Sequence, residues 1–217
     1  AYRILKRAKE EGKLREKMPI VEATSGNTGI SFSALGAYFH HPVVIFMPDW
    51  VSLERVQFMR LYGAEVHLIS KEEGGFQACI DQSKQMAKRL GGFCPRQFEN
   101  QENVLAHYEE TGREILDQIP EPIGGFISGI GTGGTLMGVG KRLKEKDRET
   151  KVIALEPAES PLLSQGYASS HLLEGIGDDF IPELVDRDLI DEIHLVSSND
   201  AICMAQKLSQ LGLGVGI

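Results

Sequence analysis

The sequence predicts an α/β protein of two lobes, in which largely parallel strands are flanked by helices. Short apolar runs alternate with longer helical segments along the whole chain, and this alternation is typical of strand–helix–strand units. Two of the predicted strand-to-helix junctions hold dense clusters of glycine, threonine and serine. With 217 residues, 41% of them hydrophobic, the chain is long enough to bury a full core.

The first predicted element is a charged helix that begins at Ala1 and carries Lys6, Lys9 and Lys13 as solvated surface groups. Further helices are expected near Ile30 and at residues 52–62, 76–90, 103–118, 136–146 and 198–211. Short buried strands are expected at residues 19–21, 43–47, 66–69, 126–128, 152–155 and 193–196. Two glycines and a proline interrupt the periodicity near residues 93–101, so we expect lobes at about 1–96 and 97–217.

The first cluster is residues 24–29, with the sequence TSGNTG, between the strand at 19–21 and the helix near Ile30. Hydroxyl and amide side chains stand there beside two glycines, which permit close approach to the backbone. Such a loop at a helix N-terminus offers N–H groups and short donors to an anion such as a carboxylate. Capping of the helix would need only one of these residues, so we favour an anion-binding loop.

The second cluster is residues 129–135, with the sequence GIGTGGT, between a predicted strand and the helix at 136–146. The glycines let backbone amides turn inward, the threonines add hydroxyl donors, and the helix dipole contributes about 0.3–2 kcal/mol for each anionic group. This order of strand, glycine loop and helix predicts a phosphate site.

A dinucleotide-binding fold is the main alternative for the second cluster. Gly129, Gly131 and Gly134 satisfy G-x-G-x-x-G, and Glu156 ends the next strand where such folds place a ribose-binding acid. Pro157 directly after that acid disagrees with this interpretation, which also gives the first cluster no role. One phosphate loop and one carboxylate loop together fit a monophosphate cofactor that holds an amino acid.

Several further motifs agree with this combination in their order along the chain. They are residues 22–29, 47–48 with 52–55, 63–65, 97–100, His107 with 111–112, 131–135 and 175–177. With these motifs the chain resembles, nearly end to end, the cysteine synthases and cystathionine β-synthases, which are pyridoxal-phosphate enzymes of the tryptophan-synthase-β fold (fold type II). The resemblance implies that pyridoxal 5'-phosphate lies in the cleft between the lobes.

The resemblance also implies roles for matching positions. Asn27 would donate to the phenolic oxygen of the cofactor, and Gln97, which alone is typical of a surface or turn residue, would help to bind the substrate. The other residues implied for the substrate carboxylate are Thr24, Ser25, Gly26 and Thr28, and those implied for the cofactor phosphate are Gly131, Thr132, Gly133, Gly134 and Thr135. His107 is interpreted as a helix-face residue without a catalytic role.

The family's Schiff-base lysine is implied immediately upstream of Ala1, and its hydroxyl group beside the pyridine nitrogen immediately after Ile217. We therefore expect no catalytic lysine in this chain, and we expect the chain to be one incomplete catalytic unit. A non-catalytic paralogue is the alternative, but the two intact loops argue against loss of function.

The reaction implied is β-replacement, with O-acetylserine and sulfide giving cysteine and acetate as the leading choice. Residues 197–202 resemble cysteine synthases more than their cystathionine relatives. However, Asp178 and Asp179 stand where cysteine synthases usually have small residues. A cystathionine β-synthase-like enzyme is therefore an alternative, as is one that converts cysteine to serine and hydrogen sulfide with water activated by Asp178 or Asp179. Both acids could instead serve only a turn.

Composition limits the partners. A net charge of −8 argues against nucleic acid, and no apolar run is long enough to cross a membrane. Cys79, Cys94 and Cys203 are widely spaced, which favours free thiols in a reducing, cytoplasmic compartment over disulfides or a metal site. We expect Cys79 and Cys203 to lie in the core. The resemblance implies a homodimer and, as a further partner, serine acetyltransferase.

Overall fold

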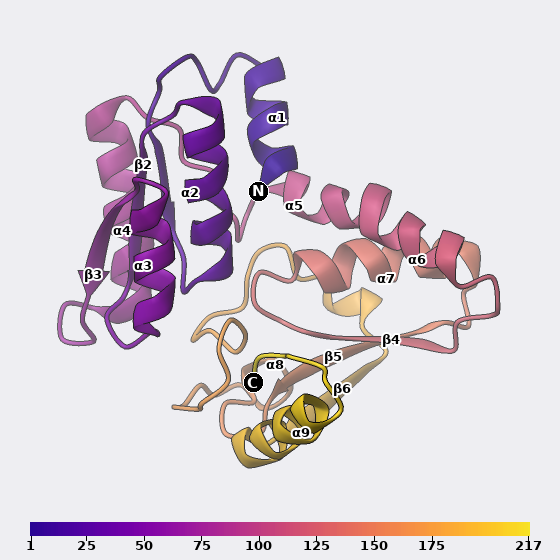
Figure 1. Cartoon of the computed structure of the whole chain (residues 1–217). Coiled ribbons are helices and arrows are strands. Elements are labelled where there is room, and N and C mark those ends of the chain that lie inside the picture. The colour runs from indigo at the N-terminus through magenta and orange to yellow at the C-terminus, as the bar shows by residue number, and fades with distance from the viewer. The chain divides into compact units, whose positions relative to one another are not determined.

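The computed structural model describes all residues from Ala1 to Ile217, and the chain falls into two compact units (Figure 1). The first unit is Ala1–Glu102 and the second is Asn103–Ile217. Each contains a three-stranded parallel sheet with helices packed on it, which confirms the predicted α/β class. The assignment of lobes to 1–96 and 97–217 remains a prediction. None of the helices is both long and apolar enough to span a bilayer.

In the first unit, the strands pair in the order β1-β2-β3, which is also their order in the chain. They are β1 (Ile20–Ala23), β2 (Val43–Pro48) and β3 (Glu65–Ile69). The helices of this unit are α1 (Tyr2–Glu10), α2 (Asn27–Phe39), α3 (Leu53–Leu61) and α4 (Gly75–Leu90). Phe93 lies beside β1 as an isolated bridge, because Val21 N–H donates to the Phe93 carbonyl at 2.9 Å and Ile20 bridges Phe93 in parallel.

Strand residues alternate between the two faces of a sheet, and the apolar residues on one face form the core of the first unit. Ile20, Ile45 and Met47 pack on one face against Phe32 from α2 and Met59 from α3. Helix α4 contacts β1 and β2 and supplies buried residues of its own, so the sheet is covered by helices on both faces. This packing fixes the C-terminal end of β1, from which the first cluster emerges.

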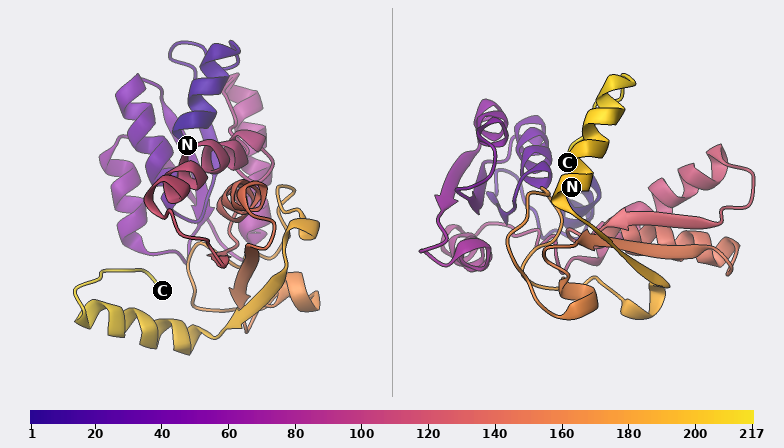
Figure 2. Two further views of the ribbon diagram at one scale, coloured as in Figure 1. Left: turned by 90° about the vertical axis from the view of Figure 1, so that its right-hand side faces the viewer. Right: turned by 90° about the horizontal axis from the view of Figure 1, so that it is seen from below.

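In the second unit, the strands pair in the order β4-β5-β6 and lie side by side in both views of Figure 2. They are β4 (Gly125–Gly129), β5 (Lys151–Pro157) and β6 (Glu192–Val196). Helix α5 (Gln101–Ala106), which begins in the last two residues of the first unit, continues into a π-helical turn (His107–Thr111) and then α6 (Gly112–Gln118). The remaining helices are α7 (Gly134–Lys146), α8 (Leu162–Gln165), a 3-10 turn (Arg187–Leu189) and α9 (Ser198–Gln210).

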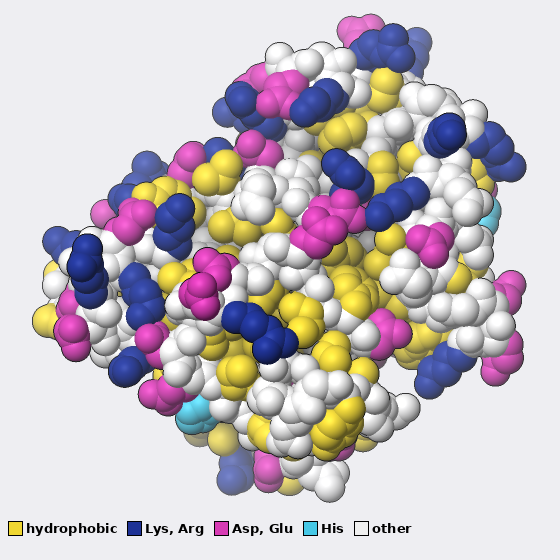
Figure 3. Space-filling model, turned by 180° about the vertical axis from the view of Figure 1, so that it is seen from behind, with side chains coloured by type: hydrophobic (Ala, Val, Ile, Leu, Met, Phe, Trp, Pro, Cys, Tyr) yellow, Lys and Arg dark blue, Asp and Glu magenta, His cyan; other side chains and the backbone are white.

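Several details differ from the predictions. Strands β3, β4 and β6 are partly exposed, with Ile127 at 55%. Successive side chains point to opposite faces of a sheet, and Ile127 lies on the face opposite to Phe126, which packs on the core. Lys13 lies beyond the end of α1, and Cys203 is exposed rather than in the core, whereas Cys79 is buried. The short α8 and the 3-10 turn were not predicted. On the face drawn in Figure 3, basic side chains lie among acidic ones.

Candidate functional site

The first cluster is only three loop residues long, because α2 already begins at Asn27. Thr24 is buried, and its N–H donates to the Phe46 carbonyl of β2 at 3.0 Å. Its hydroxyl oxygen accepts the Gly26 N–H at 3.0 Å and so closes the turn. Asn27 is exposed and Thr28 half-buried in the first helical turn, where N–H groups have no partner within the helix. These polar groups therefore gather at one helix N-terminus, as the sequence predicted.

Arg55 of α3 supports the same loop from its outer side. Its Nη1 donates to the Ser25 carbonyl at 3.0 Å. A Cβ at Gly26 would lie 2.7 Å from Arg55 Cδ, and one at Gly29 would lie 2.6 Å from Thr24 Cγ2. Close packing disfavours a Cβ at Gly29, whereas at Gly26 the Arg55 side chain would have to move. Arg55 adds positive charge beside an anion-binding loop. The sequence did not identify Arg55 as a site residue.

Gln97 is not a surface residue, although its residue type suggested one. It is buried, and Phe93, four residues before it, pairs with Ile20 of β1. Its Nε2 donates to the Ala23 carbonyl at 2.7 Å, and its backbone N–H donates to the Glu22 carboxylate at 3.1 Å. Glu22 is itself buried and also accepts the Ala23 N–H, and burial raises the pKa of its carboxyl to about 7. Gln97 is therefore held directly beside Thr24.

The second cluster follows β4 and ends at the N-terminus of α7. Gly133 has a φ of +82°, which favours glycine. A Cβ at Gly131 would collide with the Gly175 carbonyl oxygen, and one at Gly134 would collide with the Asn103 side chain. The loop thus leaves little room for side chains at these glycines, and Thr132 and Thr135 beside them are half-buried. A donor set of backbone N–H groups and two threonine hydroxyls suits a phosphate.

Two residues that the sequence did not assign to the site contact these threonines. Asn103 Nδ2 donates to the Thr132 hydroxyl oxygen at 2.9 Å. His107 Nε2 lies 3.2 Å from the Thr135 hydroxyl oxygen, and its Nδ1 lies 3.0 Å from that of Thr111. Burial lowers the pKa of His107, which favours a neutral imidazole. His107 does lie on a helix face, as predicted, and its side chain contacts Thr135 of the second cluster.

Residues 175–177 pack onto the glycine loop, and Asp178 and Asp179 follow them directly in the chain. Gly177 N–H donates to the Ile130 carbonyl at 3.0 Å, and a Cβ at Gly129 would lie 2.8 Å from Ile176. Asp178 is half-buried, and burial and the neighbouring Asp179 raise the pKa of its carboxyl to about 6. Asp179 is exposed.

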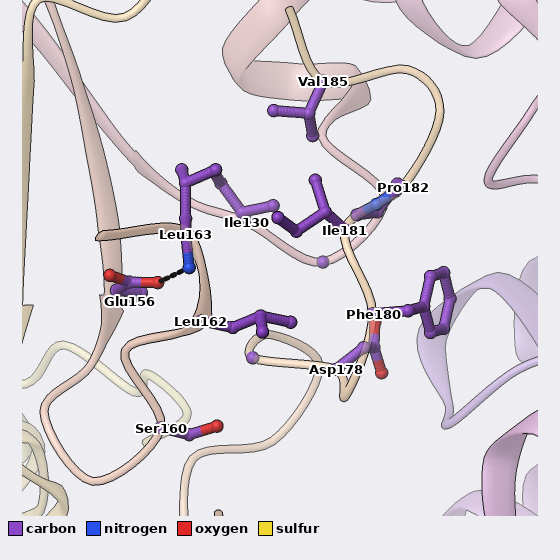
Figure 4. A pocket seen from close by; sticks show the side chains of 12 residues that line it. Ile130, Glu156, Ser160, Leu162, Leu163, Asp178, Phe180, Ile181, Pro182 and Val185 are labelled. Atoms are coloured by element: carbon purple, nitrogen blue, oxygen red, sulfur yellow. Dashed lines mark hydrogen bonds between the residues drawn. The ribbon is translucent and has the colours of Figure 1, made fainter. Parts of the chain in front are cut away.

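Asp178 borders a small pocket that also includes Gly131 of the glycine loop (Figure 4). The pocket is mainly apolar, which explains the cost of ionising the carboxyl there. Its other lining residues are Ile130, Glu156, Ser160, Leu162, Leu163, Gly177, Phe180, Ile181, Pro182 and Val185.

The carboxylate of Glu156 accepts hydrogen bonds from residues of the second unit. This finding corrects the dinucleotide alternative, in which Glu156 would bind a ribose. Its carboxylate accepts the N–H groups of Leu163 at 2.8 Å and Ser164 at 3.0 Å, and it also accepts the Ser164 hydroxyl (Figure 4). The side chain is buried at the N-terminus of α8. It is therefore a helix-capping acid and not a ribose ligand, despite its position at the end of β5.

Comparisons with known proteins agree with this arrangement. The family model described as pyridoxal-phosphate dependent enzyme matches residues 1–217. The chain is 40% identical to cysteine synthase B of Campylobacter jejuni, covering 100% of this chain and 73% of that protein. A solved hydrogen sulfide-producing enzyme from Fusobacterium nucleatum is 49% identical, with a TM-score of 0.95, over 99% of this chain and 66% of its own. An O-ureido-L-serine synthase structure is 32% identical, with a TM-score of 0.94, over 100% and 69%. The chain thus spans roughly two thirds to three quarters of these relatives.

Proposed function

This chain belongs to the pyridoxal-phosphate dependent enzymes, and from that premise we propose that it supplies the phosphate and carboxylate sites of a β-replacement enzyme of cysteine metabolism. The observation that carries the proposal is the pair of polar loops, each at the C-terminal end of a parallel strand and the N-terminus of a 13-residue helix. Ligand sites of open α/β sheets lie at such strand ends.

The glycine loop fits the cofactor phosphate. Its glycines cannot carry a Cβ, its two threonines add hydroxyl donors, and no acidic residue lies in the first turn of α7. When bound, the cofactor supplies the electron sink for chemistry at the substrate's α and β carbons. The residues of this chain would bind its phosphate through Gly131, Thr132, Gly133, Gly134 and Thr135.

The first loop fits a carboxylate. Thr24, Ser25, Gly26 and Thr28 would bind the α-carboxylate of the amino acid, and Asn27 would donate to the phenolic oxygen of the cofactor. Arg55 behind the loop favours an anion there, and its contact with Ser25 keeps the turn closed. Gln97, held by Glu22 and Ala23, would border the same carboxylate.

The leading reaction is that of the cysteine synthases. The Cβ–O bond of O-acetylserine breaks to release acetate, and a Cβ–S bond forms with sulfide to give cysteine. The curated relatives named cysteine synthase support this choice. A homodimer and an association with serine acetyltransferase remain predictions.

A second reaction is favoured by Asp178 and by the 49% identity with a hydrogen sulfide-producing enzyme. Here the Cβ–S bond of cysteine breaks, a Cβ–O bond forms with water, and the products are serine and hydrogen sulfide. The Asp178 carboxylate would take the proton from water, because a pKa near 6 leaves it ionised at neutral pH yet basic. Asp179 is the alternative base.

The test supplies pyridoxal phosphate and a full-length protein that contains this chain and a Schiff-base lysine, either with O-acetylserine and sulfide or with cysteine alone. Cysteine, serine and sulfide are then quantified for the wild type, Asp178→Asn and Asp179→Asn. Formation of cysteine that both variants retain supports the first reaction. Release of sulfide and serine that Asp178→Asn or Asp179→Asn abolishes supports the second. If neither substrate set gives a product, the proposal of β-replacement is wrong.

A further inference from the structure

The hydroxyl oxygens of Thr132 and Thr135 both contact side chains from the preceding helical segment. Thr132 Oγ1 accepts from Asn103 Nδ2 at 2.9 Å and from Gly134 N–H at 3.3 Å. Thr135 Oγ1 lies 3.2 Å from His107 Nε2. A hydroxyl group has one proton and two lone pairs. An oxygen that already accepts from two protein donors therefore keeps its own proton for a third partner.

The hydrogen bond between Thr135 and His107 can run in either direction, because a neutral imidazole donates from one nitrogen and accepts at the other. If Nε2 carries the proton, it donates to Thr135, and Nδ1 accepts the Thr111 hydroxyl proton. If Nδ1 carries the proton, Thr135 must give its own proton to His107. Only the first direction, in which His107 donates, leaves the Thr135 hydroxyl proton available to an anion in the loop.

The helical segment is held firmly against α7, so these contacts are fixed by packing. A Cβ at Gly138 would collide with the Val104 carbonyl oxygen and would lie 2.7 Å from His107 Cβ. The two backbones thus approach closely at one turn of α7. His107 begins a π-helical turn, and such turns are frequent at functional sites.

We propose that His107 and Asn103 are positioning residues that turn the hydroxyl protons of Thr135 and Thr132 toward the bound phosphate. His107 acts as the Nε2–H tautomer, which Thr111 fixes by donating to Nδ1. This inference rests on the proposed function, since it takes the cofactor phosphate as the ligand of the glycine loop. It adds a hydrogen-bonded relay from Thr111 through His107 to Thr135.

The tautomer is tested directly by nitrogen NMR of protein labelled with 15N-histidine and loaded with pyridoxal phosphate. His107 is assigned by the signal that disappears in His107→Gln. We expect a protonated Nε2 and an unprotonated Nδ1. A protonated Nδ1 with an unprotonated Nε2 would overturn the relay. A residue that merely fills space has no reason to select either tautomer.

The effect on the ligand is tested by the ratio of the dissociation constants of pyridoxal and pyridoxal phosphate, which isolates the phosphate. Removing the contact in His107→Leu is expected to lower the ratio about three- to tenfold, the range for an ordinary hydrogen bond between neutral groups. His107→Gln keeps a donor near the Nε2 position and should retain most of the ratio. His194→Leu, at an exposed position on β6, is the control and should leave it unchanged.

A double-mutant cycle separates action through Thr135 from a general structural effect. In the Thr135→Val background, His107→Leu should change the ratio by less than about twofold, because the hydroxyl it orients is gone. An equal loss in both backgrounds would overturn the inference. If instead the wild type binds pyridoxal as tightly as pyridoxal phosphate, the proposed phosphate site itself is wrong. The two failures are therefore distinguishable.

Discussion

The buried carboxyl of Glu22 makes the stability of the first unit depend on pH. It accepts N–H groups from Ala23 and Gln97, but burial outweighs these contacts and raises its pKa from 4.5 to about 7. At about 1.36 kcal/mol per pH unit, this rise is equivalent to roughly 3.4 kcal/mol between the two protonation states. Glu22→Gln removes the titrating group and keeps the size of the side chain.

The sign follows from the direction of the pKa change. A carboxyl with a raised pKa in the folded protein favours the folded state while it is protonated. That contribution is complete below about pH 4.5 and is lost as the pH rises through about 7. Between pH 5 and 8 the free energy of unfolding of the wild type should therefore fall relative to Glu22→Gln by about 2.5 kcal/mol.

The single tryptophan provides the assay, because Trp50 lies in the same unit as Glu22. Urea unfolding followed by tryptophan fluorescence at pH 5, 6, 7 and 8 gives the free energy of unfolding for each protein. Glu16→Gln, which changes an exposed acid in the same unit, is the matched control. A wild-type minus Glu22→Gln difference that stays constant over this range would refute the assignment of a raised pKa to Glu22.

Three further predictions concern the second unit. Gly131→Ala should lower the affinity for pyridoxal phosphate at least about tenfold, because the new Cβ meets the Gly175 carbonyl. Gly124→Ala, with open space around it, should leave the affinity unchanged, and a fluorescence titration measures both. Gly138→Ala should lower the free energy of unfolding by about 1–3 kcal/mol in urea melts, because α7 must move away from Val104, and an unchanged value would contradict that contact. If Asp178 activates water in the full-length protein, sulfide release from cysteine should increase as the pH rises through about 6, and Asp178→Asn should remove that increase. An identical pH profile in the variant would exclude Asp178 as the base.

Local patterns predicted much of this fold. The alternation of apolar runs and helical segments identified all six strands, because each depends on hydrophobic periodicity over only a few residues. Both loops were found at strand-to-helix junctions, since glycine and threonine clusters are a local signal. The burial of β3, β4 and β6 was overestimated, because an apolar run such as residues 126–128 does not tell which face of the sheet is covered.

Tertiary contacts account for what the sequence did not predict. Gln97 has no local signal of burial, and its position depends on the Phe93 bridge to β1 and on its own contacts with Glu22 and Ala23. Asn103 and His107 are four residues apart and so share a helix face. This spacing was the only feature of the sequence that could have connected the two residues with one site. That face could not be connected with Thr132 and Thr135 without knowing how α7 packs. Glu156 likewise fits a dinucleotide motif until its three donors from α8 are seen.

The most direct test of the account is an amide NMR titration of the 15N-labelled protein with pyridoxal phosphate, with pyridoxal as the comparison. We predict that pyridoxal phosphate shifts the backbone amides of residues 131–135 and 24–28, and that pyridoxal shifts the first group far less. Amide shifts confined to other parts of the chain, with both loops unaffected, would contradict the claim that these loops hold the cofactor and its substrate.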